Sequence, residues 1–215
     1  MKSELFKRVL SSIFLIPLII YLIIEGSYLF ILFMIICFFL TLYEWHRMSK
    51  NIIYKFIGSF FLFISFYSVY QIRFSFDNEY NLLLFILIIC VSTDIGGFIF
   101  GKIFKGPKLT KISPNKTYAG VLGSYIFSLL SNFIFLKSIN NLNLIEISSV
   151  SFFFVIILST VSQIGDLIIS YFKRQSDIKD TGNIIPGHGG LLDRIDGMIF
   201  AFPFYYLLIL FGFLL

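Results

Sequence analysis

Long apolar stretches alternate with short polar segments along almost the whole chain. Seven of them approach the ~20 residues that an α-helix needs to cross the ~30 Å hydrocarbon layer of a membrane. They are residues 9–24, 27–43, 52–70, 82–100, 118–136, 148–171 and 198–215. Apolar side chains occur all around these stretches, without the strict alternation of a barrel strand that faces a polar lumen. The pattern predicts an all-α fold, a polytopic integral membrane helix bundle with about seven transmembrane helices.

The composition excludes the other broad classes of protein. Of the 215 residues, 58% are hydrophobic and 13% are charged, whereas soluble domains carry about 25% charged residues. Intrinsic disorder requires low hydrophobicity, and a disulfide scaffold requires many cysteines, of which this chain has two. No small-residue cleavage site follows the first apolar stretch, so we expect a retained helix and not a signal peptide.

The basic residues indicate an orientation in the membrane. If the N-terminus is cytoplasmic, all of the 17 Lys and Arg residues except Arg73 and Lys137 lie in cytoplasmic segments, as the positive-inside rule requires. We therefore expect a cytoplasmic N-terminus and, after seven crossings, a C-terminus on the other side. The net charge of +5 then reflects topology, and we expect no nucleic acid as a partner.

Two acidic residues, Asp94 and Asp166, lie late in the fourth and sixth apolar stretches. A carboxylate at mid-membrane costs roughly 2.5–3.5 kcal/mol on insertion scales, so such residues usually face a polar cavity. Hydrogen bonding to Ser or Thr of a neighbouring helix is the simpler alternative. Because both acids are close to the two longest basic loops, we expect them at a polar pocket on the cytoplasmic side.

The loop before the last apolar stretch contains a second group of acids. Asp193 and Asp196 are three residues apart, so both project from one face of the first turn if the last helix begins there. With Asp166 they provide three carboxylates, the kind of ligand that Mg²⁺ prefers when it also binds phosphates. Ordinary capping of a helix is the alternative, since this spacing alone is weak evidence.

Basic and glycine residues surround these acids. Acids for a metal, cations for phosphate and a Gly-rich turn are the equipment of phosphoryl or nucleotidyl transfer. For the cations, the positive-inside bias is an equally good explanation. The residues are Lys173, Arg174, Lys179, Arg194, Gly187, His188, Gly189 and Gly190.

The other basic loop, residues 101–117, contains Ser113, Lys116 and Thr117. These residues suit either a bound phosphate or the headgroups of anionic lipids, and charge alone does not decide between them. The loop is not a P-loop, because the required glycines are missing and no strand precedes it.

The loop before the last apolar stretch, with the end of the helix that precedes it, resembles the signature of a known family. Residues 170–196 read S-x-F-K-R, four residues, K-D-x-G, and then P-G-H-G-G-x-x-D-R-x-D. This pattern resembles the signature of the phosphatidate cytidylyltransferases, also called CDP-diacylglycerol synthases. The likeness continues upstream in Ser113-Pro114-Asn115-Lys116-Thr117, while residues 1–90 match only as hydrophobic spans. We therefore expect a single membrane domain over residues 1–215, with the catalytic region in 91–215.

The resemblance implies transfer of CMP from CTP to phosphatidic acid at the cytoplasmic face of a bacterial inner membrane. It also implies Mg²⁺, with K⁺ as a second cation, and a homodimer. The implied metal ligands are Asp166, Asp193 and Asp196, with Asp94 as an additional polar site. The implied catalytic residues are Lys173, Arg174, Lys179, Asp180, His188 and Arg194. The implied substrate-binding residues are Ser113, Lys116, Thr117, Ser170, Gly187, Gly189 and Gly190.

Two other functions fit parts of the pattern. A CDP-alcohol phosphotransferase also uses intramembrane aspartates and a divalent metal, but its D-G-x-x-A-R pattern has no counterpart after Asp196-Gly197. An ion-coupled transporter could use Asp94 and Asp166 as a relay. It would show internal symmetry, whereas the charged motifs here gather in the C-terminal half.

Overall fold

The computed structural model describes residues 2–75, 79–110, 112–140, 149–184 and 189–213. Within these ranges the chain is all-α, as expected, and its only strand-like feature is an isolated bridge between Lys108 and Thr117. The helices are α1 (Lys2–Glu25), α2 (Tyr28–Met48), α3 (Ile52–Phe74), α4 (Glu79–Phe104), α5 (Tyr118–Asn140), α6 (Ser149–Gln175), α7 (Leu192–Ile195) and α8 (Met198–Leu210).

Each predicted apolar stretch falls largely within a helix, but the helices differ in length. Five of the described helices, α2 to α6, are long and apolar enough to cross a membrane, so the chain is an integral membrane protein. Two apolar segments are shorter, Ile13–Glu25 in α1 and Met198–Leu210, which is α8. The last helix thus ends earlier than expected: its 13 residues extend only about 20 Å.

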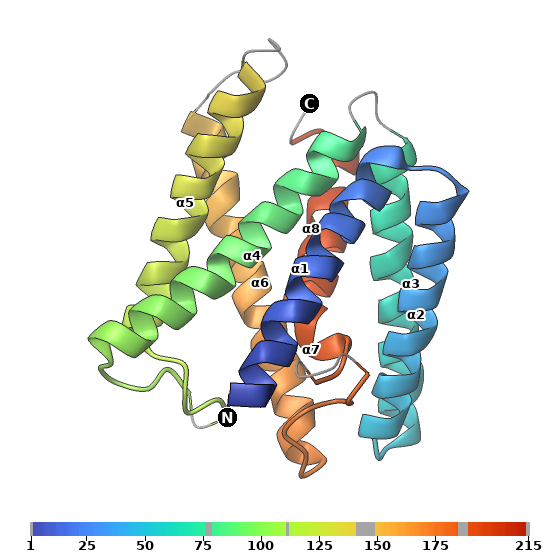
Figure 1. Cartoon of the computed structure of the whole chain (residues 1–215), viewed down its shortest axis with the longest axis vertical. Coiled ribbons are helices and arrows are strands. Elements are labelled where there is room, and N and C mark those ends of the chain that lie inside the picture. Colours follow the sequence, from blue (N-terminus) through green and yellow to red (C-terminus); the bar gives the residue numbers. More distant parts are fainter. Residues whose placement is uncertain (1, 76–78, 111, 141–148, 185–188, 214–215) are drawn as a thin grey trace.

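Helix α8 lies in the interior of the bundle and packs against α3, α4 and α6. Ile199, Ala201 and Phe202 are almost fully buried, as expected for a helix that is apolar all round. The N-terminus of the chain and α7 lie at one end of the bundle, and the C-terminus lies at the other (Figure 1). The first of these ends carries Lys50, Lys116 and Lys173, and we call it the basic end.

Helices α4 and α5 approach each other most closely. A Cβ atom on Gly123 would lie 2.4 Å from Phe100 Cβ and 2.6 Å from the Gly96 carbonyl oxygen. Small residues permit this kind of approach between membrane helices, where interhelical hydrogen bonds add to the packing. Ser124 Oγ of α5 donates such a bond to the Thr93 carbonyl of α4, at 2.7 Å.

Arg73 lies at the opposite end from most of the basic residues, and its surroundings explain the exception. Its side chain is buried at the end of α3. Nε donates to the Ile23 carbonyl at 2.7 Å, and Nη2 donates to the Ile24 carbonyl at 3.1 Å. Arg73 therefore satisfies carbonyl groups at the C-terminus of α1, where a cation is also favoured by the helix dipole.

The contact between α4 and α5 predicts the effect of a larger residue at Gly123. Gly123→Val should lose about 1–3 kcal/mol of stability because the added methyl groups force the two helices apart. Thermal unfolding in detergent can be followed by dye labelling of Cys37 and Cys90, which are both buried. Leu122→Phe is the control, since Leu122 is 63% exposed and tolerates added volume. Equal transition temperatures for the two variants would contradict the prediction.

Candidate active site

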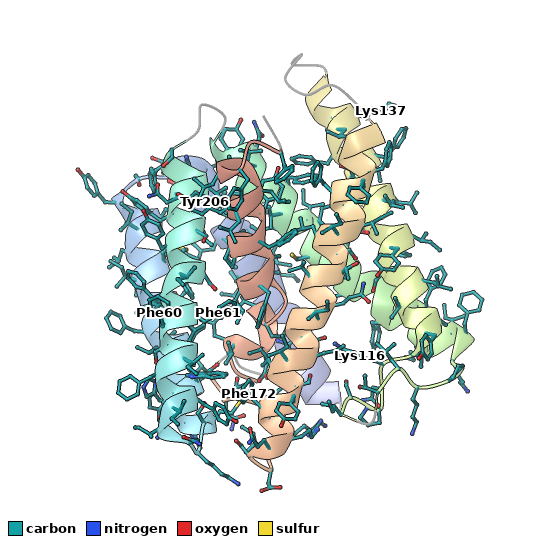
Figure 2. The ribbon with its side chains drawn as sticks, turned by 180° about the vertical axis from the view of Figure 1, so that it is seen from behind. Phe60, Phe61, Lys116, Lys137, Phe172 and Tyr206 are labelled. Atoms are coloured by element: carbon teal, nitrogen blue, oxygen red, sulfur yellow. The ribbon has the colours of Figure 1, made fainter. Side chains whose placement is uncertain are left out.

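A lysine–carboxylate pair joins the loop before α5 to α6. Lys116 Nζ lies 2.5 Å from Asp166 Oδ2. One turn further along α6, Ser170 Oγ donates to Asp166 Oδ1 at 3.2 Å. The two side chains are 25% and 27% exposed as a whole, while Lys116 Nζ itself is buried against Asp166. Lys116 is labelled in Figure 2, beside α6.

A second pair joins α6 to the segment around α7. Lys173 Nζ lies 2.8 Å from Asp193 Oδ1 and 4.0 Å from Asp196 Oδ2. These side chains are more buried than the first pair, at 7–12% exposure. Lys173 is two helical turns after Asp166, so both pairs use the same face of α6.

The loop between α4 and α5 fixes the position of Lys116. Leu109 N donates to the Lys116 carbonyl at 2.8 Å, and Lys116 N donates to the Ser113 carbonyl at 3.0 Å. Thr117 Oγ1 accepts a hydrogen bond from Gly120 N at 3.1 Å and so caps α5. The Thr117 hydroxyl, predicted to bind substrate, thus has a structural partner in this conformation.

Asp193 holds the loop together. Its Oδ2 accepts hydrogen bonds from Thr181 N at 2.8 Å and Gly190 N at 3.1 Å, and it lies 3.0 Å from Thr181 Oγ1. The expected start of the last helix is also different. Asp193 lies in the separate one-turn helix α7, and Asp196 follows it, before α8 begins at Met198.

The sequence interpretation missed Glu44, which is 1% exposed near the end of α2. Its Oε1 accepts from Leu191 N at 3.0 Å, and its Oε2 accepts from Leu192 N at 2.8 Å. Thr181 Oγ1 lies 3.0 Å from Glu44 Oε2, so this hydroxyl bridges the carboxylates of Glu44 and Asp193. A carboxylate accepting amide groups at the start of a helix is a favourable arrangement. An acid so late in an apolar stretch was the signal that could have revealed it.

Glycines allow the loop to fold around Glu44. A Cβ atom on Gly182 would lie 2.6 Å from Glu44 Oε1, and one on Gly190 would lie 2.1 Å from Thr181 Oγ1. Gly189 has a φ of +87°, in the region that favours glycine. Gly189 and Gly190, which were predicted to bind substrate, thus have a role in the folding of the loop, and their predicted role in substrate binding stays a prediction.

The three predicted metal ligands do not share one cluster here. Among the described residues, no group of three or more His, Cys, Asp or Glu side chains is arranged to hold a metal ion. Burial raises the pKa of Asp196 well above its ordinary value, and the charges of Asp166 and Asp94 raise it further, while Lys173 lowers it. Asp166 and Asp196 are thus close enough to interact, and because carboxylates are the ligands that a hard cation such as Mg²⁺ prefers, these two, without Asp193, are the residues that would hold one.

The structure also describes most of the remaining predicted residues. Arg174 Nη1 donates to the Ile178 carbonyl at 3.1 Å and so supports the end of α6. Lys179, Asp180 and Arg194 are exposed at the basic end, and Asp94 is exposed on α4. Predictions for Gly187 and His188 fall outside the described residues.

Comparison with known proteins gives consistent results. The model of the cytidylyltransferase family matches residues 50–211. A protein of Rickettsia typhi named phosphatidate cytidylyltransferase is 37% identical over 212 residues, which cover 95% of this chain and 92% of that protein. Proteins of the same name from Rickettsia bellii and Bacillus subtilis are 39% and 40% identical, over 94% and 63% of this chain and 89% and 51% of their own lengths.

The contacts of Glu44 predict that its removal loosens the loop. Glu44→Ala leaves buried donors without a partner, at about 1–3 kcal/mol each, so the amides of Leu191 and Leu192 should exchange hydrogen faster. Hydrogen exchange by mass spectrometry in detergent measures this, with Tyr43→Phe as the control because Tyr43 is 61% exposed. Unchanged exchange in Glu44→Ala would contradict the anchoring role.

Proposed function

Because the chain belongs to the cytidylyltransferase family, and is therefore a nucleotidyltransferase, we propose that it transfers CMP from CTP to phosphatidic acid. The products are CDP-diacylglycerol and pyrophosphate. The name shared by the relatives supports this choice of substrates. The observation that carries the proposal is the pairing of Lys116 with Asp166 and of Lys173 with Asp193 and Asp196 on one face of α6.

These pairs provide groups for both anionic substrates. Lys116 Nζ is buried against Asp166, and it would move from Asp166 to a phosphate oxygen when substrate binds, since an ammonium group on a flexible stem exchanges partners readily. Lys173 lies between two carboxylates and stabilises negative charge at the same place. Ser170, one turn from Asp166, can donate a hydrogen bond to a phosphate.

Asp166 and Asp196 are the residues that would hold Mg²⁺, with Asp94 nearby. When bound, the ion would neutralise charge on the nucleotide phosphates. The geometry gives Asp193 a different main task from the one that the resemblance implies. One of its oxygens already receives donors from Thr181 and Gly190, so it keeps the loop and Lys173 in position.

The reaction needs no strong base from the protein. A phosphate monoester has a second pKa near ~6, so phosphatidic acid is largely dianionic at neutral pH. One of its phosphate oxygens attacks the α-phosphorus of CTP, and the bond from that phosphorus to the oxygen bridging to the β-phosphorus breaks. Pyrophosphate leaves with the electron pair of that bond.

The basic end then faces the cytoplasm, as the positive-inside rule predicts. CTP is a soluble anion and phosphatidic acid stays in the bilayer, so the two meet at the membrane surface. The relatives are bacterial proteins, and in bacteria the membrane that faces the cytoplasm is the inner (plasma) membrane. We include that location in the proposal.

The proposal predicts the effect of removing the carboxylates. Asp166→Asn and Asp196→Asn should each lower kcat by about 10²-fold or more, the usual cost of losing a group that stabilises transition-state charge. The assay uses purified protein, phosphatidic acid, Mg²⁺ and α-labelled CTP, and it measures label that enters the lipid. Asp177→Asn is the control, because Asp177 is an exposed acid that pairs only with Lys50 among the contacts described.

The same assay separates the rival functions. If the wild-type protein does not label the lipid, but releases CMP from CDP-diacylglycerol and an alcohol, the phosphotransferase function replaces the proposal. Full activity in Asp166→Asn and Asp196→Asn would leave the reaction in place and overturn the site.

Metal dependence is a separate prediction. Addition of EDTA should abolish transfer, and excess Mg²⁺ should restore it, because the neighbouring carboxylates need a hard cation. Activity that persists in EDTA after dialysis against the chelator would contradict the metal part of the proposal.

A further inference from the structure

Two cavities lie next to each other between α3 and α6, away from the candidate active site. The first has a volume of about 290 Å³ and is lined by polar residues, including Ser49, Lys50 and Gln175. The second has a volume of about 230 Å³ and is apolar, with Trp45 and Ile57 in its lining. Tyr54 and Phe172 line both cavities, and their rings contact each other edge to face at 5.4 Å, so the two cavities adjoin at these side chains.

The apolar cavity is a groove on the side of the bundle. Helices α3 and α6 each pack on α8, and Ile199 and Phe200 of α8 contribute to the lining between them. Figure 2 shows α3 and α6 on either side of α8, with Phe61 toward the middle and Phe172 at the basic end. Ile57 is 61% and Ile168 is 36% exposed, so the groove opens toward the surrounding hydrocarbon.

The polar cavity favours an anion. Ser49 Oγ is buried and has no hydrogen-bond partner among the described residues. Lys50 forms an exposed ion pair with Asp177, at 3.0 Å, and exposed pairs are weak and easily exchanged. Helix α3 begins directly after its cap, Asn51, so the positive end of its dipole also points to this place.

We propose that this groove binds a phospholipid, with its anionic headgroup phosphate in the polar cavity and one acyl chain in the apolar cavity. The shared residues Tyr54 and Phe172 would contact the glycerol region at the boundary between the two. A soluble phosphate would use only the polar half, whereas the adjoining apolar half favours a molecule that carries both a charge and a chain. The positive charge of Lys50 selects anionic over zwitterionic lipids.

The proposed lipid site is distinct from the candidate active site. Asp166, Ser170 and Lys173 lie on one face of α6, whereas Ile168, Phe172 and Gln175 lie on another. The inference therefore does not depend on the proposed reaction, and a binding measurement without CTP tests it.

Trp45 provides a direct probe, because it is the only tryptophan of the chain and it lines the apolar cavity. The protein is placed in bilayers that contain phosphatidylglycerol or phosphatidylcholine with brominated acyl chains, at equal mole fraction. Bromine quenches tryptophan fluorescence at close range, and Trp45 is only 5% exposed. We expect stronger quenching by the brominated phosphatidylglycerol than by the brominated phosphatidylcholine.

Two variants make the result specific. Lys50→Gln should remove the preference for the anionic lipid and leave the quenching by phosphatidylcholine unchanged. Ile168→Phe should reduce quenching by both lipids, because it fills the groove. Ile164→Phe is its matched control, since Ile164 is an exposed residue of α6 (49%) that does not line the cavity. Thermal unfolding shows that each variant is folded.

The opposite results would overturn the proposal. Equal quenching by the two lipids in wild-type protein would mean that only bulk lipid reaches Trp45. Quenching that is the same in Ile168→Phe and Ile164→Phe would mean that no acyl chain enters the groove.

Discussion

The carboxylate of Glu44 is the contact on which the arrangement of the basic end depends. It is buried at the end of α2 and accepts hydrogen bonds from two backbone amides at the start of α7. A buried carboxylate is tolerated only when donors compensate for the lost water, so the loop and Glu44 require each other. Through Thr181 the same network reaches Asp193, and Asp193 in turn holds Lys173 of α6. The first helices thus take part in positioning the active site, although the match to the family model begins only at residue 50.

Electrostatic balance is the physical basis of the proposed binding of anionic substrates. Lys116 and Lys173 offset the carboxylates of Asp166 and Asp193. A divalent cation would take over the contacts of the carboxylates, and a triphosphate would take over those of the lysines. No buried charged group would then be left unpaired. The more exposed Lys116 pair is the easier one to exchange, while the more buried Lys173 pair maintains the geometry. This division of tasks follows from the difference in burial and from the different elements that carry the two lysines, the loop before α5 for Lys116 and helix α6 for Lys173.

Sequence alone predicted the helices well, because a long apolar stretch has one stable form in a membrane. The short α8 was not predicted, since hydropathy does not show that the helix ends at Leu210 within an apolar segment. Asp166 and Lys173 could be placed on one face of α6 from their spacing. The pairing of Lys116 with Asp166 could not, because it depends on the path of the loop before α5. Asp193 was predicted to be a metal ligand from its spacing to Asp196 and from the family resemblance, whereas its hydrogen bonds to the loop are tertiary contacts that no spacing reveals.

The most direct test of the central claim is a structure of the protein with Mn²⁺ in place of Mg²⁺ and an unreactive analogue of CTP, with the metal located by anomalous scattering. We expect the metal peak between Asp166 and Asp196, the nucleotide phosphates beside Lys116, and the contacts of Glu44 with Leu191 and Leu192 unchanged. A metal and nucleotide bound elsewhere, with both lysine–carboxylate pairs intact, would contradict the assignment of this site.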